Sequence, residues 1–184
     1  MQRLRVRLNS GEAMKEVIEK LSSYNLFNYL LPGILFAAFG DYITAYKIIQ
    51  KDLLIGLFLY YFVGLVISRI GSLILEPIMR RVRFVTFAPY TDFVRASQHD
   101  RKIDLFSEQN NMYRTLCALF LSLGMLKFFE IIADSIEVTP EFATYILLGL
   151  LFLLLAASYR KQTGFIKKRV ELANSSEHDA HVGQ

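Results

Sequence analysis

The sequence has a single cysteine, no tryptophan and only three histidines. One thiol, Cys117, excludes an intramolecular disulfide, and its place in an apolar run is typical of a small packing residue. His99, His178 and His181 stand without acidic or thiol companions at ligand spacing, so no metal site is expected. Walker, GxSxG and HExxH motifs and Gly-rich phosphate loops are also missing. The sequence therefore predicts a protein that is not an enzyme and has no cofactor.

Charged residues are scarce within four long apolar runs. The runs are Asn28–Ile49, Leu53–Leu75, Thr115–Ala133 and Phe142–Tyr159. Each is about 18 to 23 residues long, enough for a helix to cross a hydrocarbon layer of about 30 Å. We expect Pro32-Gly33 to kink or restart the first helix and Glu76-Pro77 to end the second. The predicted fold is all-α: an integral membrane four-helix bundle with a small cytosolic annex.

The positions of lysine and arginine predict the orientation of these helices. Five lie before the first run, seven between the second and third, and five after the fourth, whereas the two other connections hold only Lys47 and Lys51. Cytoplasmic segments of inner-membrane proteins collect basic residues. We therefore expect a multi-pass protein of the cell inner membrane, with both termini in the cytoplasm. The net charge of +4 is read as this topology signal, and no direct nucleic acid binding is expected.

The chain divides into segments of different composition. Residues 1–25 form a cytosolic amphipathic segment, with a weak strand pattern over Leu4–Leu8 and a short helix over Glu12–Ser22. Residues 26–75 and 115–160 hold the two pairs of spans, and 76–114 form a basic cytosolic loop. Within that loop a short helix should follow Pro89, and Lys102–Met112 should be helical. Residues 161–184 form a cytosolic tail that we expect to be disordered after Val170.

The basic loop is the best candidate for binding a partner. It combines arginines beside the membrane with large apolar side chains that need cover in water. The arginines alone could simply hold anionic membrane lipids. The predicted docking residues are Arg81, Arg83, Phe84, Phe87, Tyr90 and Phe93.

The charged side chains inside the spans include Asp41, Arg69, Lys127 and Glu130, and charge there is costly and usually has a purpose. Arg69 lies near the cytoplasmic end of the second span and is expected to snorkel to the headgroups. Lys127 and Glu130 are three residues apart and share a helix face, and Asp41 is expected at a similar depth in the outer half. We expect a structural ion pair near the outer interface. The alternative is a role in sensing or in lining a polar path.

Small residues form a face on the second span. Gly64, Ser68 and Ser72 recur at intervals of four, with Gly56 two turns earlier. Such a face lets another helix approach closely. It could serve packing within one subunit or between subunits of a homo-oligomer, which a thin four-helix protein is expected to form.

Two stretches carry a resemblance to a known family. They are YNLFNYLLPGILF at Tyr24–Phe36 and SEQNNMYRTL at Ser107–Leu116. With four spans and a basic inner loop, the chain resembles the small membrane subunits (KwaA) of the bacterial Kiwa antiphage system. The resemblance implies an oligomeric inner-membrane protein that detects phage attack and works with a soluble DNA-binding partner, KwaB.

Two functions follow as hypotheses. The first is an antiphage membrane sensor and scaffold that docks a soluble, KwaB-like partner through the basic loop. The second is an oligomeric pore that depolarises the membrane, lined by the intramembrane polar residues and the small-residue face.

Overall fold

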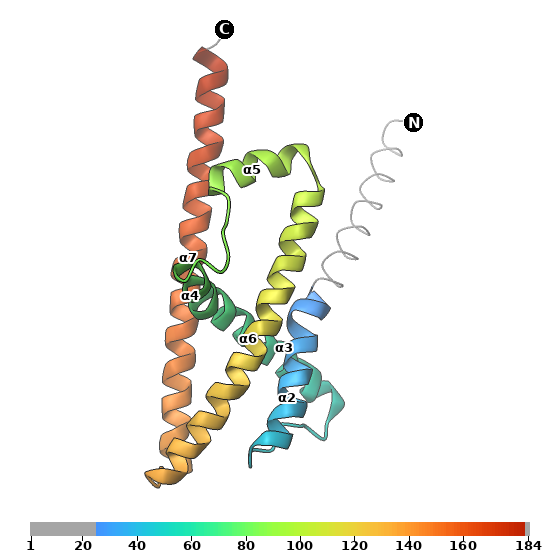
Figure 1. Ribbon diagram of the computed structural model, residues 1–184, viewed down its shortest axis with the longest axis vertical. Coiled ribbons are helices and arrows are strands. Elements are labelled where there is room, and N and C mark those ends of the chain that lie inside the picture. Colours follow the sequence, from blue (N-terminus) through green and yellow to red (C-terminus); the bar gives the residue numbers. More distant parts are fainter. Residues whose placement is uncertain (1–24, 183–184) are drawn as a thin grey trace. The chain divides into compact units, whose positions relative to one another are not determined.

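The computed structural model describes residues 25–182, with side chains described up to residue 174. Over these residues the chain is helical and contains no strand (Figure 1). Four of the helices in this part are long and apolar enough to cross a membrane: Leu26–Ile43, Leu53–Arg81, Lys102–Ser135 and Pro140–Asn174. The predictions of an all-helical fold and of four helices able to cross a membrane are confirmed over the described residues. The strand and helix predicted before residue 25 lie outside the described residues.

The first span combines a π-helical turn, η1 (Leu26–Leu30), with the helix α2 (Leu31–Ile43). The backbone N–H of Leu31 donates to the carbonyl of Leu26, five residues back. Because proline has no N–H and its ring crowds the preceding turn, this wider turn lets Pro32 remain in a continuous helix. The proline therefore changes the helical pitch without ending the span.

The first span ends earlier than predicted. Thr44 is extended, with φ −127° and ψ 167°, and its hydroxyl donates to the carbonyl of Gly40 at 2.7 Å. The carboxylate of Asp41 accepts the backbone N–H groups of Ile48 and Ile49, which holds the following residues in a loop. The expected helix up to Ile49 was wrong over this last part because these side chains compete with the helical hydrogen bonds.

The second span extends beyond its predicted end. It begins at α3 (Leu53–Ile70), where the Asp52 carboxylate caps the helix by accepting the N–H of Ile55 at 2.9 Å. It continues through the π-helical η2 (Gly71–Leu75) into α4 (Glu76–Arg81). The predicted stop at Glu76-Pro77 was wrong, because a π turn again precedes the proline and accommodates it.

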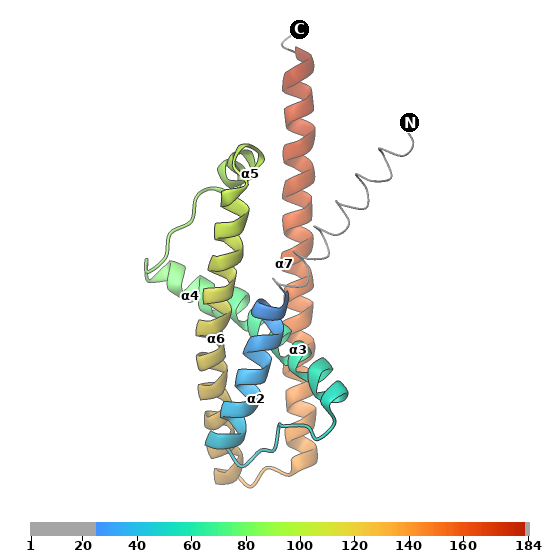
Figure 2. The same ribbon diagram turned by 90° about the vertical axis from the view of Figure 1, so that its right-hand side faces the viewer.

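The segment between the second and third spans is partly ordered as predicted. After α4 an extended stretch leads to α5 (Tyr90–His99), which follows Pro89 as expected (Figure 2). The helix predicted over Lys102–Met112 is present, and it is the first part of α6 (Lys102–Ser135). The third span therefore projects past the apolar run as one continuous helix.

The fourth span lies in α7 (Pro140–Val182), the long orange-to-red helix of Figure 1. The expectation of disorder after Val170 differs from this structure, in which the helix reaches Val182. The described part of the tail lacks proline, and Lys167 and Glu171 form an i,i+4 ion pair at 3.7 Å. Such pairs stabilise an exposed helical turn.

The helices form two compact units. The first contains the described residues up to Ser68 together with Glu108–Lys127, and the second contains Arg69–Ser107 with the residues from Phe128 onward. In the first unit Ile67 of α3 and Leu119 of α6 are buried. The core of the second is smaller and includes Val94 of α5.

Two glycines set the approach of the first two spans in the first unit. A Cβ atom built on Gly33 would lie 1.7 Å from the carbonyl oxygen of Tyr60, and one built on Gly64 would lie 1.7 Å from that of Tyr29. Each glycine therefore receives the backbone of the other helix, and the rings of Tyr29 and Tyr61 pack edge to face beside them at 5.5 Å. Close packing through small residues is the usual way that helices associate in lipid.

Candidate functional site

A buried polar cluster joins three helices of the first unit. The hydroxyl of Thr115 in α6 lies 3.0 Å from Oδ1 of Asn28 in η1 and 3.3 Å from Oγ of Ser68 in α3. All three residues are at most 2% exposed. Thr115 also lies 2.8 Å from the carbonyl oxygen of Asn111 in its own helix. Polar groups in apolar surroundings are costly unless hydrogen-bonded, so this cluster fixes the register of the helices.

The small-residue face of the second span is engaged within the chain. Gly64 receives Tyr29, and Ser68 belongs to the polar cluster. A Cβ on Gly56 would lie 3.2 Å from the ring of Tyr60. Ser72, in η2, contacts Lys161. Gly64, Ser68 and Ser72 thus contact other helices of the same chain, whereas Gly56 meets a side chain of its own helix.

The candidate intramembrane residues Asp41, Lys127 and Glu130 have different surroundings. Asp41 holds the loop after α2 through its hydrogen bonds to Ile48 and Ile49. Glu130 is buried, with 6% exposure, whereas Lys127 is exposed. Asp41 thus has a structural role that its sequence position did not reveal.

A lysine of α7 binds the π turn in the second unit. Nζ of Lys161 donates to the carbonyl oxygen of Ser72 at 2.6 Å and to its hydroxyl at 3.2 Å, and lies 3.9 Å from the Glu76 carboxylate. The N–H of Glu76 donates to Gly71, and Pro77 has no N–H to offer. The Ser72 carbonyl therefore lacks the backbone donor of a regular helix, and Lys161 replaces that donor.

The basic segment after α4 begins with an unusual residue conformation. Arg83 has a φ of 58°, in the left-handed region that glycine normally occupies. The N–H of Phe84 donates to the Met79 carbonyl at 2.9 Å, and the N–H of Arg83 donates to the Arg80 carbonyl at 3.1 Å. These two bonds form a Schellman motif that ends α4. An arginine at this position costs about 1 kcal/mol relative to glycine.

The Schellman motif presents apolar side chains to the surroundings. Phe84 is 78% exposed and Val82 is 65% exposed. Phe87 is also exposed, and the guanidinium of Arg80 stacks over its ring at 5.1 Å. We call these exposed side chains the basic aromatic patch. It comprises Val82, Phe84 and Phe87 with Arg80, Arg81 and Arg83.

The structure separates the six predicted docking residues into two groups. Arg81, Arg83, Phe84 and Phe87 are exposed. Tyr90 and Phe93, in α5, are only partly exposed, and the Tyr90 ring packs on Phe165 of α7 at 5.7 Å. Tyr90 is therefore engaged within the chain, and the exposed group is the better docking candidate.

Sequence reasoning missed several residues of these sites. Asn28 and Thr115 carried a usable signal, because each is a polar side chain at the end of an apolar run. Gly33 carried a weaker signal beside Pro32. Nothing in the sequence links Lys161 to Ser72, which lies 89 residues away.

The fold and these sites define a helical protein of the multi-pass membrane class. The buried Thr115 and Asn28 bond to each other within the chain. No group of three or more metal-ligating side chains occurs among the described residues. Comparisons with protein-family models, curated proteins and solved structures found no match for this chain.

Proposed function

We propose that the protein is a non-enzymatic membrane scaffold that docks a soluble partner protein through the basic aromatic patch. The supporting observation is that α4 ends in a strained Schellman motif which leaves Phe84 78% exposed beside Arg81 and Arg83. Backbone strain that persists in a folded protein often marks a functional site. The partner that fits is a protein with an apolar pocket bordered by carboxylates.

The proposed setting is the bacterial inner membrane, with both termini and residues 76–114 in the cytoplasm. The distribution of basic residues supports this orientation. The resemblance to the Kiwa membrane subunits supports a role as an antiphage sensor with a KwaB-like partner. We also propose a homo-oligomer, because no residue in the apolar stretch of the fourth span is buried within the chain. Native mass spectrometry of the detergent-purified protein tests the subunit number.

The polar contacts favour a scaffold over a depolarising pore. Gly64, Ser68 and Ser72 are engaged by neighbouring helices of the same chain, and Asp41 holds a loop. These are groups that the pore hypothesis requires at a water-filled lining. A planar-bilayer recording that shows conductance lost on Lys127→Leu would reverse this preference.

Partner capture provides the direct test of the docking proposal. The tagged chain is co-expressed with a KwaB-like soluble protein, the partner that the resemblance implies, and co-purification is measured for the original chain and Phe84→Asp. A buried aromatic anchor contributes about 2 kcal/mol or more, so capture should fall at least about tenfold. Phe106→Asp, which changes a 63% exposed phenylalanine of α6, is the matched control and should retain capture.

A second variant separates docking from stability. Arg83→Gly removes a cation from the patch while supplying the residue that the left-handed backbone prefers, so the fold should be as stable as before or more stable. We expect weaker capture and, in a phage plating assay, weaker protection. Unchanged capture with Phe84→Asp would assign these side chains to the lipid interface and overturn the docking role.

A further inference from the structure

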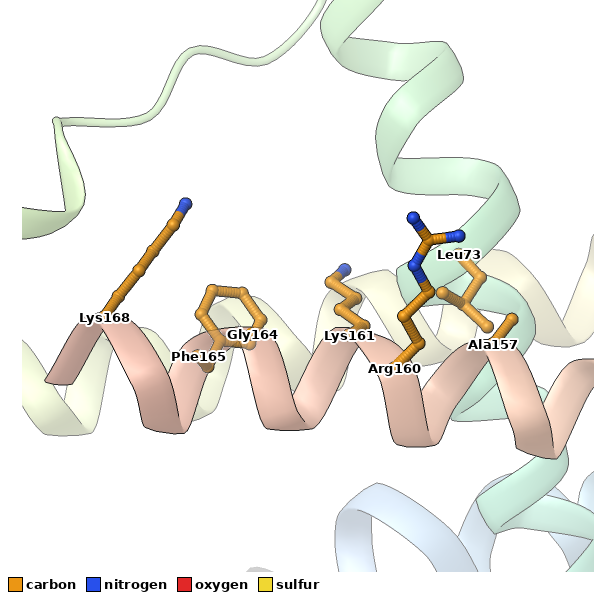
Figure 3. A pocket seen from close by; sticks show the side chains of 7 residues that line it. All are labelled: Leu73, Ala157, Arg160, Lys161, Gly164, Phe165 and Lys168. Carbon is orange, nitrogen blue, oxygen red and sulfur yellow. The ribbon is translucent and has the colours of Figure 1, made fainter. Parts of the chain in front are cut away.

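An open groove lies along α7 in the second unit, just past the apolar part of the fourth span. Its volume is about 410 Å³, and its lining includes Leu73, Ala157, Arg160, Lys161, Phe165 and Lys168. Figure 3 shows the nitrogen ends of Arg160, Lys161 and Lys168 on the same side of α7, with the Phe165 ring between them. Leu73 comes from η2.

The helical spacing explains this convergence of side chains. Residues 157, 161, 164 and 168 recur at intervals of three or four, so they share one face of α7. Gly164 stands at the centre of that face, and a Cβ built on it meets no atom within 4 Å. The missing side chain leaves space in the middle of the groove.

The charges around the groove favour an anionic ligand. Three of its lining residues are cations, and Glu76 is the acid that approaches them, 3.9 Å from Lys161. Lys161 is held by Ser72 and lies 5.9 Å from the Phe165 ring centre. Lys161 thus helps to build the wall, while Arg160 and Lys168 present exposed charge. A fork of guanidinium and ammonium groups suits phosphate oxygens.

The position of the groove along the span favours a lipid as the source of that phosphate. The apolar run of α7 ends at Tyr159, and the cations begin at Arg160. A site with an apolar edge and a basic edge at this boundary matches a phospholipid, whose phosphate lies next to its glycerol and acyl chains.

We propose that this groove binds the phosphate ester of an anionic phospholipid between Arg160 and Lys168, with Leu73, Ala157 and Phe165 contacting the apolar part. The site is separate from partner docking. Phe84→Asp should leave lipid binding unchanged, so failure of one proposal does not imply failure of the other.

Native mass spectrometry of the detergent-purified full chain tests this proposal. The probes are dioctanoyl phosphatidylglycerol and, as the uncharged comparison, dioctanoyl phosphatidylcholine. We expect tighter binding of phosphatidylglycerol. A basic side chain near an anionic headgroup strengthens binding about fivefold, so the double variant Arg160→Gln, Lys168→Gln should weaken it roughly twentyfold.

Two controls separate a built site from general surface charge. The double variant Lys167→Gln, Arg169→Gln removes the same charge from exposed positions outside the groove and should weaken binding less than about threefold. Gly164→Leu fills the groove without changing charge and should abolish the preference, whereas Gly149→Leu, also in open space, should not. Circular dichroism verifies that every variant is helical.

Competition with soluble phosphates identifies the source. If inorganic phosphate or glycerol 3-phosphate displaces phosphatidylglycerol at equal concentration, the groove serves a soluble phosphate ester; if neither displaces it, the ligand is the lipid. Equal weakening by the two double variants would overturn the proposal. So would equal binding of the two lipids, or full binding by a helical Gly164→Leu variant.

Discussion

At the residue scale, a few buried polar side chains connect one span to another. Thr115 is completely buried and lies within hydrogen-bond distance of Asn28 and Ser68 on two other helices. Its single hydroxyl proton serves one acceptor at a time, so the Ser68 hydroxyl donates to Thr115 when Thr115 donates elsewhere. The cluster is therefore a small cooperative network.

Thr115→Val tests this network, because valine keeps the shape and removes the hydroxyl. We expect a loss of about 1 kcal/mol in the free energy of unfolding, typical of interhelical hydrogen bonds in membranes. Steric trapping in bicelles measures it. Thr144→Val is the control, since Thr144 is exposed and bonds only to Pro140 of its own helix. Equal losses would show that the interhelical bonds add nothing.

Gly64 and Gly124 offer a second comparison at the residue scale. Gly64→Ala would place a methyl group 1.7 Å from the Tyr29 carbonyl oxygen and force the first two spans apart. We expect at least about 2 kcal/mol of destabilisation, as for overpacked cores. Gly124→Ala meets no atom within 4 Å and should be neutral or stabilising by up to about 1 kcal/mol through helix propensity. Thermal unfolding by circular dichroism measures both.

Residue spacing predicted part of these sites. The intervals of four picked out Gly64, Ser68 and Ser72, because helical geometry alone puts them on one face. Spacing within one helix could not reveal the partners of these residues. Contact with Gly33, Thr115 or Lys161 depends on how separate helices align. The partners of Asp41 were hidden for a related reason, because they are backbone groups of a loop whose sequence looked like more helix.

At the scale of elements, the two prolines near span ends show one shared device. Leu31 and Glu76 each precede a proline and each donates its N–H to a carbonyl five residues back. The π turn widens the helix before the proline ring and removes the clash. This explains why the proline rule misjudged where the second span ends, although the apolar run located the span itself.

Lys161 and Pro77 should be thermodynamically coupled through this device. Lys161→Met leaves the Ser72 carbonyl without its donor and should destabilise the second unit by about 1 kcal/mol or more. In a Pro77→Ala background, residue 77 regains an N–H that can serve Ser72, so the same substitution should cost less. A double-mutant cycle of thermal unfolding measures the difference. Purely additive effects would contradict the assigned role of Lys161, and Lys167→Met is the matched control.

At the scale of the whole molecule, apolar length and the placement of basic residues carry different information. Length and composition predicted four spans, and the described residues contain four helices long and apolar enough to cross a membrane. The orientation depends on the bias of lysine and arginine between loops, a property of insertion into the membrane that a helical arrangement by itself does not encode.

Reporter fusions test the orientation. Green fluorescent protein inserted near position 95 should fluoresce, and alkaline phosphatase inserted there should be inactive, if residues 76–114 are cytoplasmic. Insertions near position 50 and position 138 should give the opposite pattern. An active phosphatase near position 95 would place the basic aromatic patch outside the cytoplasm, where the proposed partner could not reach it.

Gly33 and Gly64 each lie against the backbone of the other span, and this contact has a consequence for the order in which the helices associate. Both residues precede α6 in the chain, and their contact does not involve α6. We expect the first two spans to close as a hairpin while the ribosome is still translating the third. On this order the hydroxyl of Thr115 joins Asn28 and Ser68 only after the backbone contact has formed.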